Sequence, residues 1–392
     1  MSGNLNVSSK TTTMGKGKIL LTGAAGYIAS HTWVELSQSG YDVVGVDNFY
    51  NSERDVIDRI GKIIGKPANF EEADCSDFES FKKVFEKNPD IVGAVHFAAY
   101  KAVGESIEKP LDYYRNNLTS LLNLITLIRE KGKRANIVFS SSCTVYGQPD
   151  KDHLPIAENA PLKRSLSPYG KSKQMAEEIL SDSVIAYPEL KVCALRYFNP
   201  IGAHPSALIG ELPRGVPQNL VPFVTQTAGG IRDHLNVFGD DYNTPDGSCI
   251  RDYIYVVDLA KAHVKAIDKL TGNMSTCENC CKQEAGDKGC GDNAGENCCK
   301  TIDEPTYVEA AKTGRWFVYN LGTGKGLSVL ELVNGFMKAT GVNLPYQIAP
   351  RRQGDIEQVW ADPRKAEREL GWKADTPIED VLRSAWEWQK TL

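Results

Sequence analysis

Long apolar runs, basic stripes and an apolar amino-terminal core are all missing from this sequence of 392 residues. No run approaches the ~18 apolar residues that a membrane span needs, so we expect no membrane partner. Lysine and arginine gather into no stripe and the formal net charge is −5, which argues against nucleic acid as a ligand. The opening MSGNLNVSSKTTTMGKGK is polar, so we expect residues 1–17 to be a disordered tail and the protein to be cytoplasmic.

Residues 18–48, KILLTGAAGYIASHTWVELSQSGYDVVGVDN, predict a strand, a glycine turn, a helix and a second strand that ends at Asp47. Such units build parallel sheets with helices on both faces, so we expect a Rossmann-type, doubly wound α/β fold. Gly23 allows a tight turn, Gly26 lets backbone N–H groups approach a pyrophosphate, and Ala29 is small enough for helix packing. A carboxylate at Asp47 accepts hydrogen bonds from a ribose and repels a 2′-phosphate, so the predicted cofactor is NAD rather than NADP.

Two further buried strands are predicted by the stretches IVGAVHFAA and ANIVFSSSCTVYG. We expect Ser140, Ser141 and Ser142 just beyond the carboxyl end of the second of these strands, where ligands of such sheets bind. The serines are either turn caps or polar members of a site, and the predicted fold favours a site.

The stretch SPYGKSK places Tyr169 and Lys173 one helical turn apart, with Ser167 as a helix cap and Pro168 in the first turn. We expect the ammonium group of Lys173 to lower the pKa of the Tyr169 phenol, ~10 when unperturbed, and so to make a base. Taken alone, such spacing is more often a solvated pair on a helix surface, so the other motifs decide between the two interpretations.

The chain contains seven motifs in this order: TGAAGYIAS, DNFYNS, HFAAYKAVGES, SSSCTVYG, SPYGKSK, RYFNPIGAHPS and RRQGD. Together they resemble the extended short-chain dehydrogenase/reductase family, and within it the UDP-glucose 4-epimerases. The resemblance implies an NAD-binding Rossmann domain over 18–196 and a smaller mixed α/β domain over 197–392 that binds a UDP-hexose. It further implies that 249–271 and 316–322 return to the first domain, and that the protein is a homodimer.

The same resemblance implies site residues. Tyr169 would be the catalytic base, Lys173 its partner, and Ser142 the group that binds the sugar's 4-oxygen. The residues implied for NAD are Gly23, Gly26, Tyr27, Ile28, Asp47, Asn48, Asn51, Ser52, Asp74, Cys75, Phe97, Ala98, Ala99, Lys101, Asn116, Tyr169, Lys173 and Phe198. The residues implied for the UDP-sugar are Ser142, Asn199, Asn219, Leu220, Asn236, Val237, Phe238, Arg251, Arg352, Asp355 and Val359. Guanidinium groups bind a diphosphate bidentately, which singles out Arg251 and Arg352. We expect none of these residues to hold a metal.

Val359 stands where, by the resemblance, a tyrosine restricts the pocket to plain hexoses and a smaller residue admits N-acetylated ones. The chain would then interconvert UDP-GlcNAc and UDP-GalNAc as well as UDP-glucose and UDP-galactose. The alternative interpretation is that Val359 is core beside Trp360 and that its neighbours fill the space.

The implied reaction is NAD-dependent 4-epimerisation by transient oxidation at C4 of the sugar, in which the hydride returns to the opposite face of a 4-keto intermediate. A nucleotide-sugar 4,6-dehydratase is the nearest alternative, but it would need an Asp-Glu pair where Cys143 and Thr144 stand. A non-enzymatic NAD-binding scaffold is the second alternative, and the presence of Tyr169 and Lys173 argues against it.

A Cys-rich insertion, which we place at 273–314, contains six of the ten cysteines within residues 277–299. Cys277 and Cys280 have the spacing of zinc ligands, and a later cysteine pair could complete the set. We favour the alternative of a disordered or redox-labile surface loop, because the later pair is adjacent in sequence and no histidine helps. Neither is needed for epimerisation.

Overall fold

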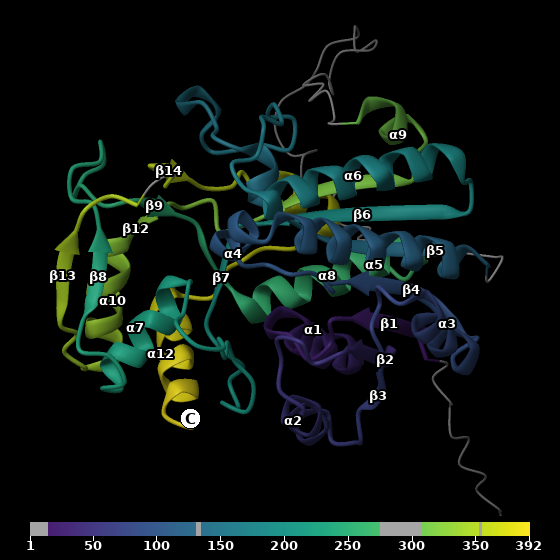
Figure 1. Ribbon diagram of the computed structural model, residues 1–392, viewed down its shortest axis with the longest axis horizontal. Coiled ribbons are helices and arrows are strands. Elements are labelled where there is room, and N and C mark those ends of the chain that lie inside the picture. Colours follow the sequence, from purple (N-terminus) through teal and green to yellow (C-terminus); the bar gives the residue numbers. More distant parts are fainter. Residues whose placement is uncertain (1–14, 131–134, 275–306, 353–354) are drawn as a thin grey trace, which may run out of the picture.

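A computed structural model describes residues 15–130, 135–274, 307–352 and 355–392. These residues form two lobes, a large sheet with helices on both faces and a smaller lobe of short strands and helices (Figure 1). Every helix among the described residues is too short or too polar to span a bilayer.

In the described part of the chain, the large sheet has seven strands, all parallel, in the order β11-β6-β5-β4-β1-β2-β3. The strands are β1 (Lys18–Thr22), β2 (Asp42–Asp47), β3 (Asn69–Glu72), β4 (Ile91–His96), β5 (Ala135–Ser142), β6 (Leu190–Tyr197) and β11 (Trp316–Leu321). The chain order reverses between β1 and β4, and ligands of such sheets bind at the carboxyl ends of the strands beside that reversal. The predicted doubly wound fold is confirmed.

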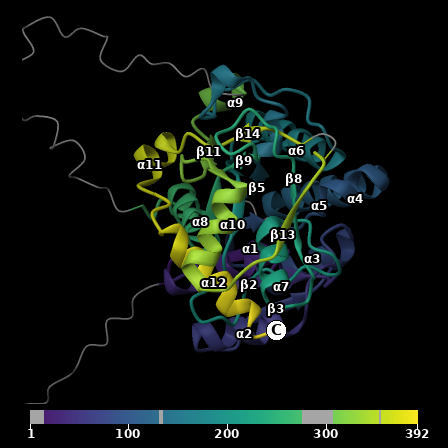
Figure 2. The ribbon, with the colours of Figure 1, turned by 90° about the vertical axis from the view of Figure 1, so that its left-hand side faces the viewer.

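Two apolar cores lie on the two faces of this sheet. Ile19 and Leu21 face one core and Leu20 faces the other, because successive side chains of a strand point to opposite faces. The helices of the first core are α1 (Tyr27–Gln38), α2 (Asp55–Ile64), α8 (Val256–Thr271) and α11 (Arg364–Leu370). Those of the second are α3 (Phe78–Lys87), α5 (Pro110–Glu130), α6 (Pro168–Ala186) and α9 (Val308–Lys312), and α4 (Val103–Glu108) packs against α5 and α6. Figure 2 shows α8 and α11 on one side of the sheet and α5 and α6 on the other.

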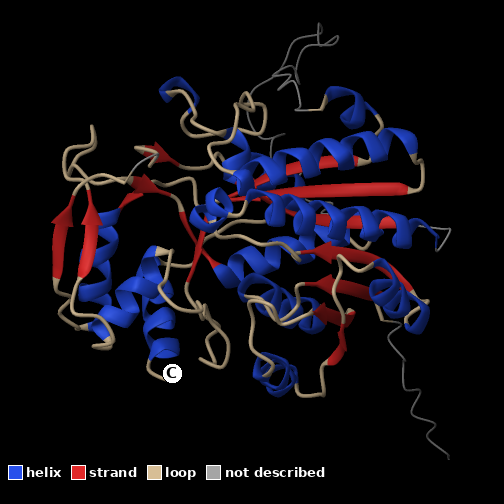
Figure 3. Ribbon diagram, viewed as in Figure 1, coloured by secondary structure: helices blue, strands red, loops and turns tan. Residues whose placement is uncertain are grey.

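The smaller lobe is built from short sheets of two or three strands, with helices, around a third core (Figure 3). Its strands are β7 (Asn199–Ile201), β8 (Leu235–Phe238), β9 (Ile250–Arg251), β10 (Tyr253–Tyr255), β12 (Leu327–Ser328), β13 (Tyr346–Ala349) and β14 (Gln358–Val359). Its helices are α7 (Leu220–Ala228), α10 (Val329–Thr340) and α12 (Ile378–Gln389). Two short 3-10 helices, η1 (Cys143–Tyr146) and η2 (Lys151–His153), follow β5. The predicted carboxyl-terminal helix is confirmed, since Val381, Leu382 and Ala385 of α12 are buried in the third core.

The start of α6 is formed as the sequence predicts. The hydroxyl of Ser167 accepts a hydrogen bond from the N–H of Gly170 at 3.1 Å, and Pro168 occupies the first turn. This cap fixes the register of the helix that carries Tyr169 and Lys173.

The three serines differ from the prediction. Ser140, Ser141 and Ser142 are the last residues of β5 rather than residues beyond it, because the ladder with β6 continues as far as the pair Ser142 and Tyr197. They therefore belong to a rigid strand.

The structure describes part of the predicted amino-terminal tail and part of the predicted Cys-rich insertion. Lys16, which we assigned to the tail, pairs with Asp268 at 3.0 Å. Residues 308–312, which we assigned to the insertion, form α9, and Ala310 is buried in the second core. The six clustered cysteines and the zinc-site alternative lie outside the described residues.

Candidate active site

The glycine turn after β1 lies against the loop after β4. Gly23 has a φ of +67°, and a Cβ atom there would lie 2.9 Å from the backbone nitrogen of Ala98, so a larger residue would not fit. Gly26 is the N-cap of α1 and offers no side chain to its first turn. The turn therefore meets the two requirements of a pyrophosphate site, close backbone approach and a helix start without a side-chain cap.

The carboxylate of Asp47, at the end of β2, joins this turn to the next loop. Oδ2 accepts a hydrogen bond from the N–H of Ala25 at 3.0 Å, and Oδ1 accepts from the N–H of Phe49 at 2.8 Å and from Ser52 Oγ at 3.1 Å. Burial raises the pKa of Asp47, and these hydrogen bonds lower it. Asp47 ends β2 at the edge of the sheet where ligands of such folds bind, which places its carboxylate to accept from a ribose hydroxyl. The residues present fit NAD.

Other residues implied for NAD follow the neighbouring strands. Asn48 donates a hydrogen bond to Asp74 at 3.0 Å, which joins the loops after β2 and β3. Asn48 and Ser52 also line a cavity of about 480 Å³ at this edge of the sheet. Asn51 is exposed, Cys75 and Phe198 are buried, and Phe97 contacts the ring of His263. The structure thus brings the residues after β1, β2, β3 and β4 to one edge.

Ser142, Tyr169 and Lys173 meet beside that edge. Ser142 ends β5, and its hydroxyl is close enough to Tyr169, in the first turn of α6, to lower the pKa of the phenol. The Nζ atom of Lys173 donates to the carbonyl oxygen of Ser140 at 2.6 Å and lies 5.9 Å from the ring centroid of Tyr169. Lys173 is only 4% exposed, so its ammonium group is held inside the protein.

The pKa values in this cluster differ from the expectation. Burial raises the pKa of Tyr169 to about 12, although the hydrogen bond from Ser142 opposes the rise. Burial also lowers the pKa of Lys173 to about 7, and the nearby charge of Glu177 opposes that shift. Desolvation is the largest cause of both shifts, and Nζ of Lys173 is bonded to a carbonyl oxygen rather than to the phenol.

A buried ion pair lies beneath the cluster, and sequence reasoning missed it. Arg196 on β6 bonds both carboxylate oxygens of Glu177 on α6, at 3.0 and 2.6 Å, and both side chains are 0% exposed. Glu177 also accepts from Ser141 Oγ at 2.5 Å. The spacing signalled Glu177 alone, since Tyr169, Lys173 and Glu177 follow one another at four-residue intervals on one helical face, and it did not point to Arg196.

Arg251, Arg352 and Asp355 are brought together in the smaller lobe. One oxygen of Asp355 accepts from Arg251 at 2.7 Å and the other accepts from Arg352 at 3.3 Å. The guanidinium group of Arg352 also lies 4.8 Å from the ring centroid of Phe238. Asp355 thus holds two cations in place, an arrangement that suits a diphosphate.

A thiol links this group to the catalytic cluster. Burial raises the pKa of Cys143 to about 11, and the charge of Arg251 opposes the rise. Cys143 in turn raises the pKa of Tyr169. The charge of Arg251 thus acts on Cys143, and Cys143 acts on Tyr169.

Val359 on β14 is 5% exposed and pairs in register with Arg251 on β9. Its side chain lies in a small core with Val145, Ile156 and Phe198. Both interpretations of Val359 agree with this burial, because Phe198 is itself a residue implied for the NAD site.

The remaining residues implied for the UDP-sugar are spread along the smaller lobe. Asn199 lies on β7, Asn219 and Leu220 begin α7, and Asn236 on β8 accepts from Gln347 at 2.8 Å. The side chain of Val237 is buried in the third core, so a ligand could meet this position only through its backbone. No group of three or more potential metal ligands occurs among the residues that the structure describes.

Comparison with known proteins gives one family. Residues 19–275 match the NAD dependent epimerase/dehydratase family. The chain is 46% identical to the UDP-glucose 4-epimerase of Bacillus subtilis over 373 residues, which cover 95% of this chain and 97% of that protein.

Solved structures agree. The UDP-glucose 4-epimerase of Stenotrophomonas maltophila, with bound NAD and formylated UDP-arabinopyranose, is 41% identical, has a TM-score of 0.82 and covers 96% of this chain and 98% of its own. The UDP-glucose 4-epimerase of Bifidobacterium longum, in complex with NAD+ and UDP, is 44% identical, has a TM-score of 0.80 and covers 95% and 98%. The chain therefore belongs to the NAD dependent epimerase/dehydratase family, and within it to the UDP-glucose 4-epimerases.

Proposed function

We propose that this protein interconverts UDP-glucose and UDP-galactose with NAD as a resident cofactor. The observation that carries the proposal is the meeting of Ser142, Tyr169 and Lys173 beside the glycine turn, with Arg251 in register with Val359, whose small core also contacts Cys143. A proton acceptor, a dinucleotide site and a diphosphate site thus adjoin one another. Bound NAD would supply the acceptor that takes the C4 hydride and gives it back.

Tyr169 is the base in this proposal. Its phenol oxygen takes the proton of the sugar's 4-hydroxyl and later returns it, while Ser142 donates a hydrogen bond that favours the phenolate. The pKa of Tyr169 is near 12 and that of Lys173 is near 7, so at any pH between these two values the pair together carries one proton. The reactive form is the one in which this proton sits on Lys173.

Arg251 and Arg352 anchor the diphosphate of the substrate in this proposal. Each already shares Asp355, so binding a phosphate requires little reordering of either side chain. An anchor at the UDP end leaves the sugar free to turn, and turning is what lets the hydride return to the other face.

Val359 supports a wider substrate range. A valine at this position is smaller than a tyrosine, because it lacks the ring and the hydroxyl. Its register partner is Arg251, which we propose to bind the diphosphate. We include UDP-GlcNAc and UDP-GalNAc among the substrates on this ground.

Exposed apolar side chains support a homodimer. Leu111 and Leu122 of α5 are 70% and 48% exposed and stand eleven residues apart, three helical turns, on one face. Met175 and Ile185 of the adjoining α6 are 41% and 48% exposed. A second copy would cover this α5–α6 face, and Leu122→Glu should then shift the sedimentation coefficient from dimer to monomer.

The four described cysteines are free thiols, which supports a cytoplasmic location.

The central test uses purified protein and UDP-galactose without added cofactor. We expect UDP-glucose as the product, because the resident NAD is restored in every cycle. A 4-keto-6-deoxy product would identify a dehydratase instead, and unchanged substrate would remove the proposal.

A further inference from the structure

The segment of residues 202–219, which we name the strap, connects β7 to α7 and touches the first lobe at three places. Near its start, the carbonyl oxygen of Gly202 accepts from Tyr27 Oη at 2.6 Å. Further along, Arg214 reaches the loop after β2 and Glu211 reaches the loop after β4. These contacts reach the start of α1, directly after the glycine turn, and two loops, all of which contain residues that the sequence analysis implied for NAD.

Arg214 makes the most extensive of these contacts. Its two terminal nitrogens donate to the carbonyl oxygens of Tyr50 and Ser52, at 2.8 and 2.7 Å, and its Nε donates to Glu53 at 3.1 Å. Each of its three guanidinium nitrogens thus donates a hydrogen bond to the loop that follows β2. The side chain also lines the cavity of about 480 Å³ that Asn48 and Ser52 line. Arg214 therefore forms a wall of that cavity from the opposite lobe.

Glu211 joins residues from both lobes. Its carboxylate, 9% exposed, accepts from Asn219 at 2.6 Å and pairs with Lys101 at 3.4 Å. Its carbonyl oxygen accepts from Trp388 Nε1 on α12 at 3.0 Å. Lys101 was implied for NAD and Asn219 for the UDP-sugar, so a single carboxylate orients one side chain of each predicted site.

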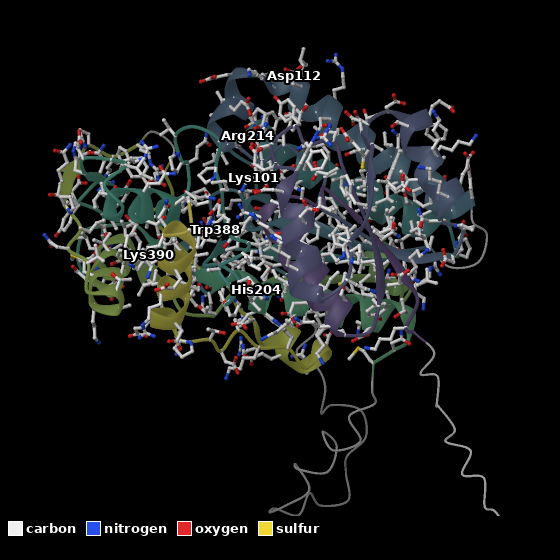
Figure 4. The ribbon with its side chains drawn as sticks, turned by 90° about the horizontal axis from the view of Figure 1, so that it is seen from below. Lys101, Asp112, His204, Arg214, Trp388 and Lys390 are labelled. Carbon is white, nitrogen blue, oxygen red and sulfur yellow. The ribbon has the colours of Figure 1, made fainter. Side chains whose placement is uncertain are left out.

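Figure 4 labels Lys101, Arg214 and Trp388, which lie where the two lobes meet. The strap is anchored to the smaller lobe as well: the N–H of Ala203 donates to Ser384 on α12 at 3.0 Å. A segment fixed at one side and bonded across to three loops restrains those loops relative to one another.

We propose that the strap is a clasp that retains the cofactor, with Arg214 and Glu211 as its positioning residues. The proposal rests on the proposed function, because an enzyme that regenerates its NAD in each cycle gains by not releasing it. Release would require the start of α1 and the loops after β2 and β4 to part, and the strap bonds to all three. Neither residue is assigned a contact with the reacting atoms.

The test measures release of NAD from the protein as purified. Holoprotein loaded with isotope-labelled NAD is chased with excess unlabelled NAD, and retained label is counted after gel filtration at successive times. We expect Arg214→Ala to release label about 10-fold faster than the native chain, since it loses charged hydrogen bonds to two carbonyls and one carboxylate. Arg214→Lys should fall between the two, because it keeps the charge but loses the planar fork.

The matched control is Arg368→Gln, a 66% exposed arginine on α11 whose partner is the adjacent Glu369. It should release label at the native rate and keep native activity. The melting temperature of each variant, measured with saturating NAD, separates faster release from general destabilisation. Equal release rates for Arg214→Ala, Arg368→Gln and the native chain would overturn the clasp.

A second variant tests the other end of the strap. Glu211→Gln keeps an acceptor for Asn219 but loses the charge that faces Lys101, so we expect faster release of NAD together with a higher KM for the UDP-sugar. A change in kcat alone would contradict this role. Failure of the proposed function would look different: the native chain itself would purify without NAD and would not epimerise, and the clasp would fall with it.

Discussion

The Nζ atom of Lys173 is bonded to the carbonyl oxygen of Ser140, two positions before Ser142 on the same strand. Strand β5 therefore sets the positions of both the ammonium group and the hydroxyl that adjoin Tyr169. The phenol itself comes from α6, whose start is fixed by its Ser167 cap. The geometry of the cluster thus depends on how one strand and one helix pack, and on the ion pair between Arg196 and Glu177 that lies beneath it.

Replacing Tyr169 by phenylalanine removes the proposed proton acceptor and leaves the ring. We expect turnover to fall by about 10²- to 10⁴-fold, the usual contribution of a positioned base, while NAD stays bound. Turnover of UDP-galactose and the NAD content of the purified protein are the measurements. Tyr346→Phe, at a 43% exposed position on β13, is the control that should keep full activity. Near-native activity of the Tyr169 variant would show that another group is the base.

The pH dependence follows from the two pKa values. The native pair takes up a second proton below pH about 7, so kcat/KM should rise with pH through that value and then level off. In Lys173→Met the phenol alone must ionise, with a pKa near 12. Activity of this variant should rise about tenfold per pH unit above pH 7, where the native profile is level, because the fraction of phenolate grows tenfold with each pH unit below the pKa of the phenol. A variant profile that levels off near pH 7 would contradict the shared proton.

Breaking the buried ion pair should destabilise the protein. Arg196→Met leaves the carboxylate of Glu177 without its cation in a position that is 0% exposed, and such losses cost about 3–5 kcal/mol in the free energy of unfolding. Urea denaturation followed by circular dichroism measures the change. Replacing Glu177 by methionine in the same chain should recover part of the loss, because no buried charge then remains unpaired. A double variant less stable than Arg196→Met would show that the loss has another cause.

Substrate range tests Val359. We expect the native chain to epimerise UDP-GlcNAc as well as UDP-glucose, and Val359→Tyr to lower kcat/KM for the N-acetylated sugar selectively, by about 10- to 100-fold, since added bulk meets the acetamido group first. Val359→Leu is the control for repacking of the small core around this position. An equal loss for both sugars in the tyrosine variant, or a native chain without N-acetyl activity at saturating substrate, would favour the core interpretation.

Local signals were sufficient for the sheet and the glycine turn. Sequence spacing alone predicted the positions of Gly23, Gly26 and Asp47, because a turn, a helix start and a strand end are local features. The cap at Ser167 was readable for the same reason. What the sequence could not give was desolvation: the pKa values of Tyr169 and Lys173 depend on how deeply α6 is buried against β5, and spacing says nothing about depth.

Long-range partners were also out of reach. Arg196 and Glu177 are nineteen residues apart on different elements, and Arg214 lies more than 160 residues from the carbonyls that it binds. No periodicity connects such positions, so only the folded chain shows that they meet.

The pairing of Val359 with Arg251 couples two properties that a pocket could otherwise acquire separately. The residue proposed to select the sugar and the residue proposed to hold the diphosphate stand side by side on neighbouring strands, β14 and β9. The two ends of the proposed substrate would thus meet adjacent strands of one small sheet, so the sugar is selected within one strand spacing of the guanidinium group that binds its phosphates.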